Sequence, residues 1–162
     1  FCPVMQWHAE PRNGQFFATG DAAWNNDRSP WNLARRWNDP SIAEIACAFA
    51  RLRERLRPML YEEAKACVKE GRPMMAHLCL DFPEDPLALA CGDEYMLGRK
   101  LLVAPIVQPG AEGRKVYLPK GRWKHFFTGR VYEGGQTVEL ACPLNEALVL
   151  EREEEERWNC AI

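Results

Sequence analysis

The sequence predicts an α+β protein in which a helical region precedes an antiparallel β-sandwich. Apolar residues recur every three or four positions between residues 41 and 70, which is the spacing of one helix face. From residue 72 onward the apolar runs are short and are separated by turns rich in Pro and Gly, a pattern typical of a sandwich. Residues 1–40 show little periodicity and are rich in Trp, Asn, Pro and Gly, so we expect a loop-dominated segment there.

The helix predicted over residues 41–70 has a start signal and a stop signal. Residues 39–41 (Asp-Pro-Ser) offer a cap, and Glu44 stands three residues after the serine, as in a capping box. Gly71 favours a stop, whereas Pro58 is expected to kink or interrupt the helix because it lacks a backbone donor. The predicted core-facing stripe consists of Ile42, Ile45, Ala46, Phe49, Leu52, Leu56, Leu60 and Ala64.

The region after residue 72 contains five strand-like runs. They cover residues 74–80, 101–107, 115–118, 123–128 and 137–141, and each is bounded by Pro or Gly turn signals. Residues 151–157 form a run of charges, which predicts a solvated end.

Composition excludes several classes of partner. The 162 residues carry a net charge of −2 with Lys and Arg scattered among acids, so no nucleic acid is expected as a partner. No apolar run approaches the ~20 residues of a membrane span, so no membrane is expected either. The seven cysteines contain no CxxC pair, which argues against a metal site and favours thiols in the reducing cytoplasm. Because the chain begins at Phe1 inside an apolar run, we expect a truncated protein.

The residue pattern by itself specifies no reaction. Acids are plentiful, but no spacing singles out a catalytic pair, and GxSxG, HExxH and phosphate-loop motifs are absent. No cofactor is therefore expected. Among the histidines, His77 is predicted to be structural and His125 to lie on a strand face. His8 ends an apolar run and begins the Trp-rich loop, a placement that in a β/α barrel points a side chain into the active site.

Six strings of the sequence, in order, resemble glycoside hydrolase family 31. Residues 1–8 are similar to F-x-P-x-x-R-x-H, residues 28–31 to E/R-x-P-W, residues 52–61 to L-R-x-x-L-x-P-Y-x-Y, residues 71–85 to G-x-P-x-M-R-x-L-x-x-x-F/Y-P-x-D, residues 93–106 to D-x-Q-Y-M-x-G-x-x-L-L-V-A-P-V, and residues 116–129 to V-Y-L-P-x-G-x-W-x-x-x-x-T-G. Four positions depart from these strings: Gln6 replaces Arg, Met59 replaces Tyr, Ala76 replaces Arg and Glu94 replaces Gln. The first departure lies near the sugar and bears on substrate details.

The resemblance implies a fold and an activity. Residues 1–70 would be the last strand, the active-site loop and the final helices of a (β/α)8 TIM barrel, and residues 71–162 the β-sandwich domain that follows it. The whole protein would be a retaining α-glycosidase that hydrolyses α-linked glucosides or xylosides through a covalent glycosyl-enzyme intermediate. In the family both catalytic aspartates lie on earlier strands, so this chain would contain no catalytic residue and would be inactive alone. A complete barrel takes about 250 residues.

The resemblance also assigns a sugar subsite. It implies that His8 binds sugar hydroxyls, and Trp7 and Trp24 could line the rim, whereas Trp31 would pack behind the site. Two other hypotheses remain. The sandwich could be a non-catalytic module that binds sugar or a partner through exposed Trp123, Phe126, Phe127 and Tyr132, although these positions also fit a core. The chain could instead self-associate to cover apolar surface that the absent strands would leave.

Overall fold

The computed structural model describes residues 1–5 and 29–153. The chain divides into two compact units, one of Val4–Pro58 and one of Phe1–Pro3 with Met59–Ile162. The predicted domain boundary after residue 70 stays a prediction. No helix in the described ranges has both the length and the apolar character needed to cross a membrane.

Helix α2, residues Pro30–Trp37, begins and ends with specific caps that the sequence analysis did not identify. The Ser29 hydroxyl accepts a hydrogen bond from the Asn32 amide at 3.4 Å, and Pro30 occupies the first turn. At the other end Asn38 adopts the left-handed conformation, with φ at 51°. A helix therefore forms inside the segment that we expected to be dominated by loops.

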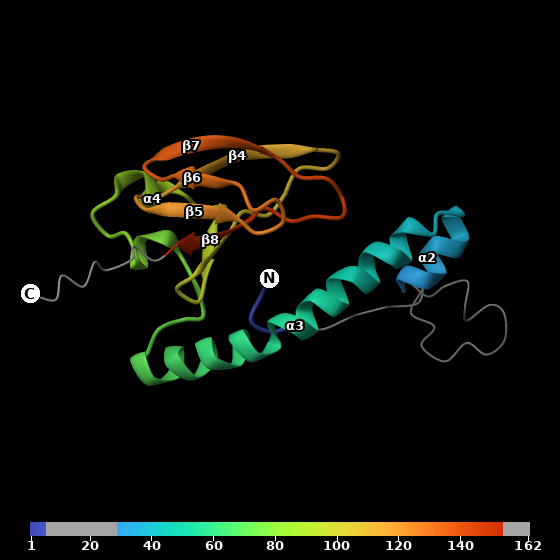
Figure 1. The fold of residues 1–162 in the computed structure, drawn as a ribbon, viewed down its shortest axis with the longest axis horizontal. Coiled ribbons are helices and arrows are strands. Elements are labelled where there is room, and N and C mark those ends of the chain that lie inside the picture. The colour runs from blue at the N-terminus through green and yellow to red at the C-terminus, as the bar shows by residue number, and fades with distance from the viewer. Residues whose placement is uncertain (6–28, 154–162) are drawn as a thin grey trace, which may run out of the picture. The chain divides into compact units, whose positions relative to one another are not determined.

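Helix α3 spans Ser41–Glu70, as predicted, but its start differs in detail (Figure 1). The Asp39 carboxylate accepts hydrogen bonds from the Ser41 amide at 3.0 Å and the Ser41 hydroxyl at 2.6 Å, so an aspartate side chain organises this terminus. The helix runs through Pro58 without interruption. It ends at Gly71, whose φ of 66° lets the Arg72 amide bond back to the Cys67 carbonyl. The eight residues of the predicted stripe are all buried or half-buried.

Antiparallel sheets follow the helix, as the sequence predicted (Figure 1). One sheet has six strands in the order β1-β2-β3-β8-β5-β6, and the other pairs β4 with β7. The strands are β1 (Met75–Ala76), β2 (Tyr95–Leu97), β3 (Leu101–Val103), β4 (Gly113–Leu118), β5 (Arg122–His125), β6 (Val131–Glu133), β7 (Gln136–Ala141) and β8 (Val149–Glu153). Two short helices complete this unit, the 3-10 helix η1 (Leu78–Leu80) and α4 (Pro86–Ala90).

The solvated end predicted over residues 151–157 begins inside a strand, although the side chains of Glu151 and Arg152 are exposed, as predicted. Glu151, Arg152 and Glu153 belong to β8, which lies inside the six-stranded sheet between β3 and β5. Glu151 pairs with both neighbouring strands, and Arg152 and Glu153 pair with β5. The carboxylate of Glu153 lies 3.3 Å from the exposed Arg122 guanidinium. A charged side chain can therefore stay near water although its backbone occupies a central ladder.

Several predicted runs also have different ends or different conformations. Residues 78–80 form η1 rather than a strand, and His77 begins this helix by accepting a hydrogen bond from the Cys79 amide at 3.2 Å. His77 is thus structural, as predicted. Strands β2, β6 and β8 lie outside the five predicted runs.

The hydrophobic core draws side chains from both sheets around Trp123. Trp123 has no exposed surface, and its indole N–H donates to the Pro119 carbonyl at 2.7 Å. The surrounding cluster includes Met96 and Leu102 from the six-stranded sheet and Val116 and Leu140 from the two-stranded sheet. The two sheets therefore share one core, as in a sandwich.

Gly134, which follows β6, provides a test of this packing. A Cβ atom there would lie 1.9 Å from the Pro119 carbonyl oxygen, which belongs to the backbone and has little freedom to move. We expect Gly134→Ala to lower the free energy of unfolding by about 3 kcal/mol, because the connections after β4 and β6 must separate. Gly92→Ala is the matched control, since its Cβ meets nothing within 4 Å, and it should change stability by less than about 0.5 kcal/mol. Urea unfolding measures both, and equal effects would contradict this packing.

Candidate functional site

The predicted sugar-binding residues Trp7, His8 and Trp24 lie outside the described residues. Trp31 lies on α2 with 55% of its surface exposed in this chain, and the packing behind the site expected of it stays a prediction. Of the strand predicted over residues 1–8, the structure describes residues 1–5, and these form bends and irregular backbone rather than a strand.

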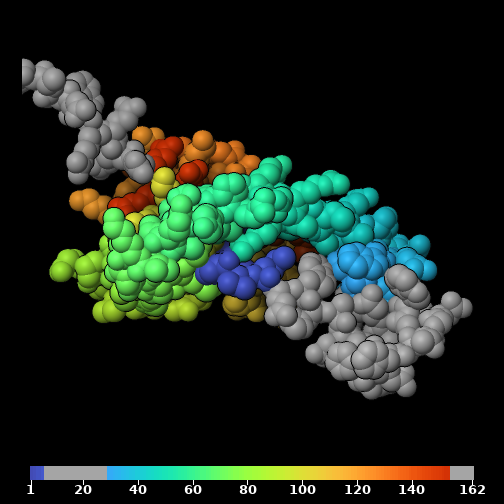
Figure 2. Space-filling view, turned by 90° about the horizontal axis from the view of Figure 1, so that it is seen from below, coloured from blue at the N-terminus to red at the C-terminus, as the bar shows by residue number. Residues whose placement is uncertain are grey.

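Phe1 is held by an aromatic cluster that belongs to the same compact unit. Its ring meets Phe126 edge-on at 5.3 Å and Phe127 at 6.2 Å between centroids, and the two partners meet each other at 5.3 Å. The Tyr95 hydroxyl donates a short hydrogen bond to the Phe1 carbonyl. Both the side chain and the backbone of Phe1 are thereby fixed to the sandwich. Figure 2 shows the first residues, drawn in blue, at the surface.

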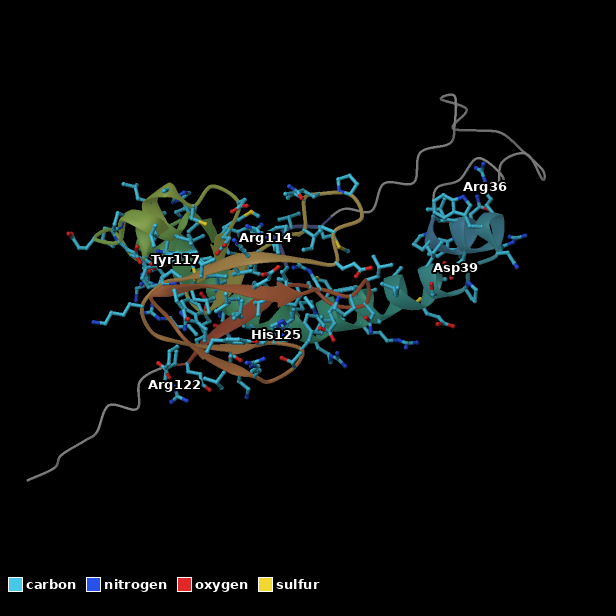
Figure 3. The ribbon with its side chains drawn as sticks, turned by 90° about the horizontal axis from the view of Figure 1, so that it is seen from above. Arg36, Asp39, Arg114, Tyr117, Arg122 and His125 are labelled. Atoms are coloured by element: carbon cyan, nitrogen blue, oxygen red, sulfur yellow. The ribbon has the colours of Figure 1, made fainter. Side chains whose placement is uncertain are left out.

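His125 shapes the turn that presents these phenylalanines (Figure 3). It ends β5 with only 3% exposure, and its Nδ1 accepts from the amides of Phe127 and Thr128, both at 3.3 Å. Burial lowers the pKa of His125, which favours the neutral ring that such an acceptor requires. His125 is therefore a structural histidine at the end of a strand.

The four aromatic residues proposed as an exposed sugar platform are not exposed. Trp123 is fully buried, and Phe126, Phe127 and Tyr132 are half-buried. The observation that would have favoured a separate sugar-binding module is therefore absent at these four positions.

A cluster of polar residues lies where the loop before β2 meets β4. Arg114 of β4 is central to it, with its guanidinium 2.5 Å from the Asp93 carboxylate and 3.7 Å from that of Glu94 (Figure 3). The same guanidinium donates to the carbonyls of Asp93 at 3.1 Å and Pro105 at 2.9 Å. Glu94 accepts from the Tyr117 amide at 2.8 Å, and the Cys91 thiol lies 3.7 Å from Asp93.

The two neighbouring carboxyls of this cluster have opposite pKa shifts. Hydrogen bonding from Arg114 lowers the pKa of Asp93, whereas burial raises the pKa of Glu94 to about 7. Burial and the adjacent Glu94 charge raise the pKa of Cys91 to about 11, so this thiol is protonated. Farther along β4, burial and the hydrogen bond from its hydroxyl to Asp85 raise the pKa of Tyr117 to about 12.

Split carboxyl pKa values often mark an acid and base pair, but one of these two carboxyls is closed to substrates. The side chain of Glu94 is only 2% exposed. A pocket of about 400 Å³ lies beside the cluster, and its polar lining comprises Asp93, Gln108, Arg114 and Lys115. Because Asp93 is the single carboxylate in that lining, the pocket lacks the two carboxyl groups that glycoside hydrolysis requires.

The same residues make a poor metal site. Ligand atoms of Cys91, Asp93 and Glu94 lie within 4.8 Å of one another, but the Arg114 guanidinium already provides their positive charge. A coordinating thiol must be deprotonated, and the high Cys91 pKa opposes this. The arrangement is that of a structural ion-pair cluster.

Comparison with known proteins identifies close likenesses. Residues 71–155 match the family model described as the glycosyl hydrolase family 31 C-terminal domain. The chain is 34% identical over 146 residues to an isomaltosyltransferase of Sporosarcina globispora and 29% identical over 146 residues to an α-xylosidase of Saccharolobus solfataricus. Each alignment covers 90% of this chain, but only 13% and 17% of those proteins.

A solved structure shows the same relation. A cycloalternan-degrading enzyme from Trueperella pyogenes, in complex with cycloalternan, superimposes with a TM-score of 0.83 at 33% identity. The match covers 94% of this chain and 20% of that one, and the same enzyme has been solved with isomaltose. The chain thus spans a fifth or less of these relatives.

The Tyr95 hydroxyl was not singled out by the sequence analysis, although Tyr95 stands in the string that resembles D-x-Q-Y-M. We expect Tyr95→Phe to lower the free energy of unfolding by about 1 kcal/mol, because the Phe1 carbonyl loses its donor. Tyr132→Phe removes a hydroxyl in the same unit for which no hydrogen bond is found among the described residues, and it should cost less than about 0.5 kcal/mol. Urea titration of the whole chain distinguishes the two, and an equal loss in both variants would argue against the anchor.

Proposed function

Since the chain belongs to glycoside hydrolase family 31, we propose that it is the C-terminal part of a retaining α-glycosidase that acts on α-linked glucosides or xylosides. The observation that supports this most directly is the family match over residues 71–155, a range that contains all eight strands. The names of relatives support the substrate class, since they include an α-xylosidase and an enzyme called α-glucosidase 2 from Bacillus thermoamyloliquefaciens.

Residues 1–70 are, in this proposal, the last strand, active-site loop and final helices of a (β/α)8 barrel. The anchored Phe1 supports it, because a strand that enters a binding site needs a fixed starting point. His8 follows seven residues later and binds the hydroxyls of the sugar. A neutral imidazole both donates and accepts a hydrogen bond, so it can recognise a pair of hydroxyls. Trp7 and Trp24 line the rim of the same subsite.

The reaction itself requires residues outside this chain. A retaining glycosidase places two carboxyl groups about 5–5.5 Å apart, one as nucleophile and one as acid and base. Of the described carboxyl pair, Asp93 is held by the Arg114 guanidinium and Glu94 is too buried to reach a substrate. We therefore assign sugar positioning and support of the barrel to residues 1–162, and both catalytic carboxylates to the remainder of the enzyme.

Two further features of the proposal concern the setting of the protein. The six cysteines in the described ranges are free thiols, which supports a cytoplasmic location. Several large apolar side chains have more than half of their surface exposed, among them Trp31, Trp37 and Tyr61. Such exposed apolar surface supports association of the isolated chain with itself or with the rest of the enzyme.

Activity assays test the proposed division of roles. Purified residues 1–162 should release no 4-nitrophenol from an aryl α-glucoside or an aryl α-xyloside, because neither catalytic carboxylate is present. A polypeptide extended upstream of Phe1 to include a barrel should hydrolyse one of them. In that enzyme His8→Ala should lower kcat/KM about 10- to 100-fold, since it removes hydrogen bonds to the sugar.

His77→Ala is the matched control, because His77 caps a short helix of the sandwich and is assigned no contact with sugar. Its kcat/KM should stay within about twofold of that of the unchanged enzyme, which corresponds to about 0.4 kcal/mol. Hydrolysis by residues 1–162 alone would disprove the claim that both catalytic carboxylates lie outside this chain. An unchanged kcat/KM in His8→Ala would disprove the role of that histidine.

A further inference from the structure

We propose that the buried carboxyl of Glu94 is a proton-binding site of the sandwich, protonated in the folded protein near neutral pH, and that loss of its proton weakens the packing of the 91–94 loop on β4. The inference concerns the stability of the domain and does not depend on the proposed enzymatic function.

The position of Glu94 leaves one of its oxygens without a partner. The residue is 5% exposed and immediately precedes β2. One oxygen, Oε1, accepts from the Tyr117 amide at 2.8 Å and lies 3.7 Å from the Arg114 guanidinium. The other, Oε2, is buried and makes no hydrogen bond to the described residues. An ionised carboxylate would thus keep about half of its charge on a buried atom without a partner, which costs several kcal/mol. A protonated carboxyl places a neutral O–H there, which costs about 1–3 kcal/mol.

The charges that face Glu94 do not neutralise it. From its own loop come Asp93 and the Cys91 thiol, and from β4 come Arg114 and Tyr117. Asp85, the N-cap of α4, accepts a hydrogen bond from the Tyr117 hydroxyl at 2.6 Å.

Arg114 is the single cation in this group, and it is committed to another partner. It lies 2.5 Å from Asp93, which is 53% exposed at its side chain and can remain ionised in contact with water. Its remaining hydrogen bonds go to the carbonyls of Asp93, Pro105 and Lys115. One guanidinium thus faces two carboxyls, and the more exposed carboxyl is the closer.

The pKa of Glu94 agrees with this geometry. Burial is the largest influence on Glu94 and raises its pKa to about 7, against the lowering effects of the Tyr117 amide and the Arg114 charge. The family string D-x-Q-Y-M has glutamine at this position, where the present sequence has Glu94. A protonated carboxyl resembles that amide, because both are neutral and offer a donor beside an acceptor.

The sign of the pH dependence follows from a raised pKa in the folded state. The contribution of Glu94 to stability is complete below its ordinary pKa of 4.5 and is lost as the pH rises through about 7. The pKa values of Glu94 in the unfolded and folded states differ by about 2.5. Between pH values below 4.5 and above 8, this group alone therefore lowers the folding equilibrium constant about 300-fold. His125 acts in the opposite direction over an overlapping range, because its pKa is lowered and its contribution is lost on acidification. A comparison of variants at each pH separates the two.

The experiment is urea unfolding of the whole chain between pH 5 and pH 9, for the unchanged protein and for Glu94→Gln. The variant should be more stable above pH 7, and the ratio of the two folding constants should rise by about two powers of ten between pH 5 and pH 9. Glu112→Gln is the matched control, because Glu112 is exposed one residue before β4. The ratio of its folding equilibrium constant to that of the unchanged protein should not change with pH across the same range.

A direct measurement detects the proton itself. The infrared C=O stretch of a protonated carboxylic acid should be present at pH 6 and should disappear above pH 8. At pH 6 it should be missing from Glu94→Gln but present in Glu112→Gln. The proposal is overturned if this band is absent at pH 6. It is also overturned if Glu94→Gln is less stable than the unchanged protein at pH 9, or if the stability ratio is independent of pH.

Discussion

Backbone pairing of β8 on both of its sides is the interaction on which the sandwich depends. Val149–Glu153 pairs with β3 through Leu102↔Leu150 and with β5 through Trp123↔Arg152, so one strand joins the two halves of the six-stranded sheet. The Val149 carbonyl also accepts the Phe126 amide at 2.9 Å. The turn that His125 organises is thereby fixed to the sheet, and the aromatic anchor of Phe1 depends on that turn. The closing strand thus supports the contact that holds the start of the chain.

Local features of this fold could be predicted from the sequence, and long-range ones could not. Helix α3 and its stop at Gly71 follow from periodicity and from a residue that tolerates positive φ, both of which are properties of neighbouring residues. Strand β8 was not predicted, because its last three residues, Glu151, Arg152 and Glu153, are charged and nothing local reveals the strands that pair with it. The cap was predicted within residues 39–41, but Asp39 and Ser41 are both good capping residues and only geometry decides between them.

The candidate sites, too, were predictable in part from the sequence and in part only from the folded structure. Ordered family strings identified the family, because they combine many positions at once, and the family match over residues 71–155 agrees. The contact between Tyr95 and Phe1 joins residues 94 positions apart, which no spacing rule can anticipate. Glu94 was visible only as a departure from a string. Its consequence emerges from burial and from the orientation of Arg114, which are properties of the folded chain.

Perturbed carboxyl pKa values in this domain arise from structure rather than catalysis. Asp93 and Glu94 are adjacent in sequence, and their pKa values move apart because one faces water and Arg114 while the other is enclosed. A catalytic acid needs the same split, but it must also touch its substrate, and a side chain that is 2% exposed cannot. Exposure is therefore the criterion that separates the two cases. By this criterion Glu94 is no catalytic acid, and the sugar subsite predicted around His8 stays a proposal.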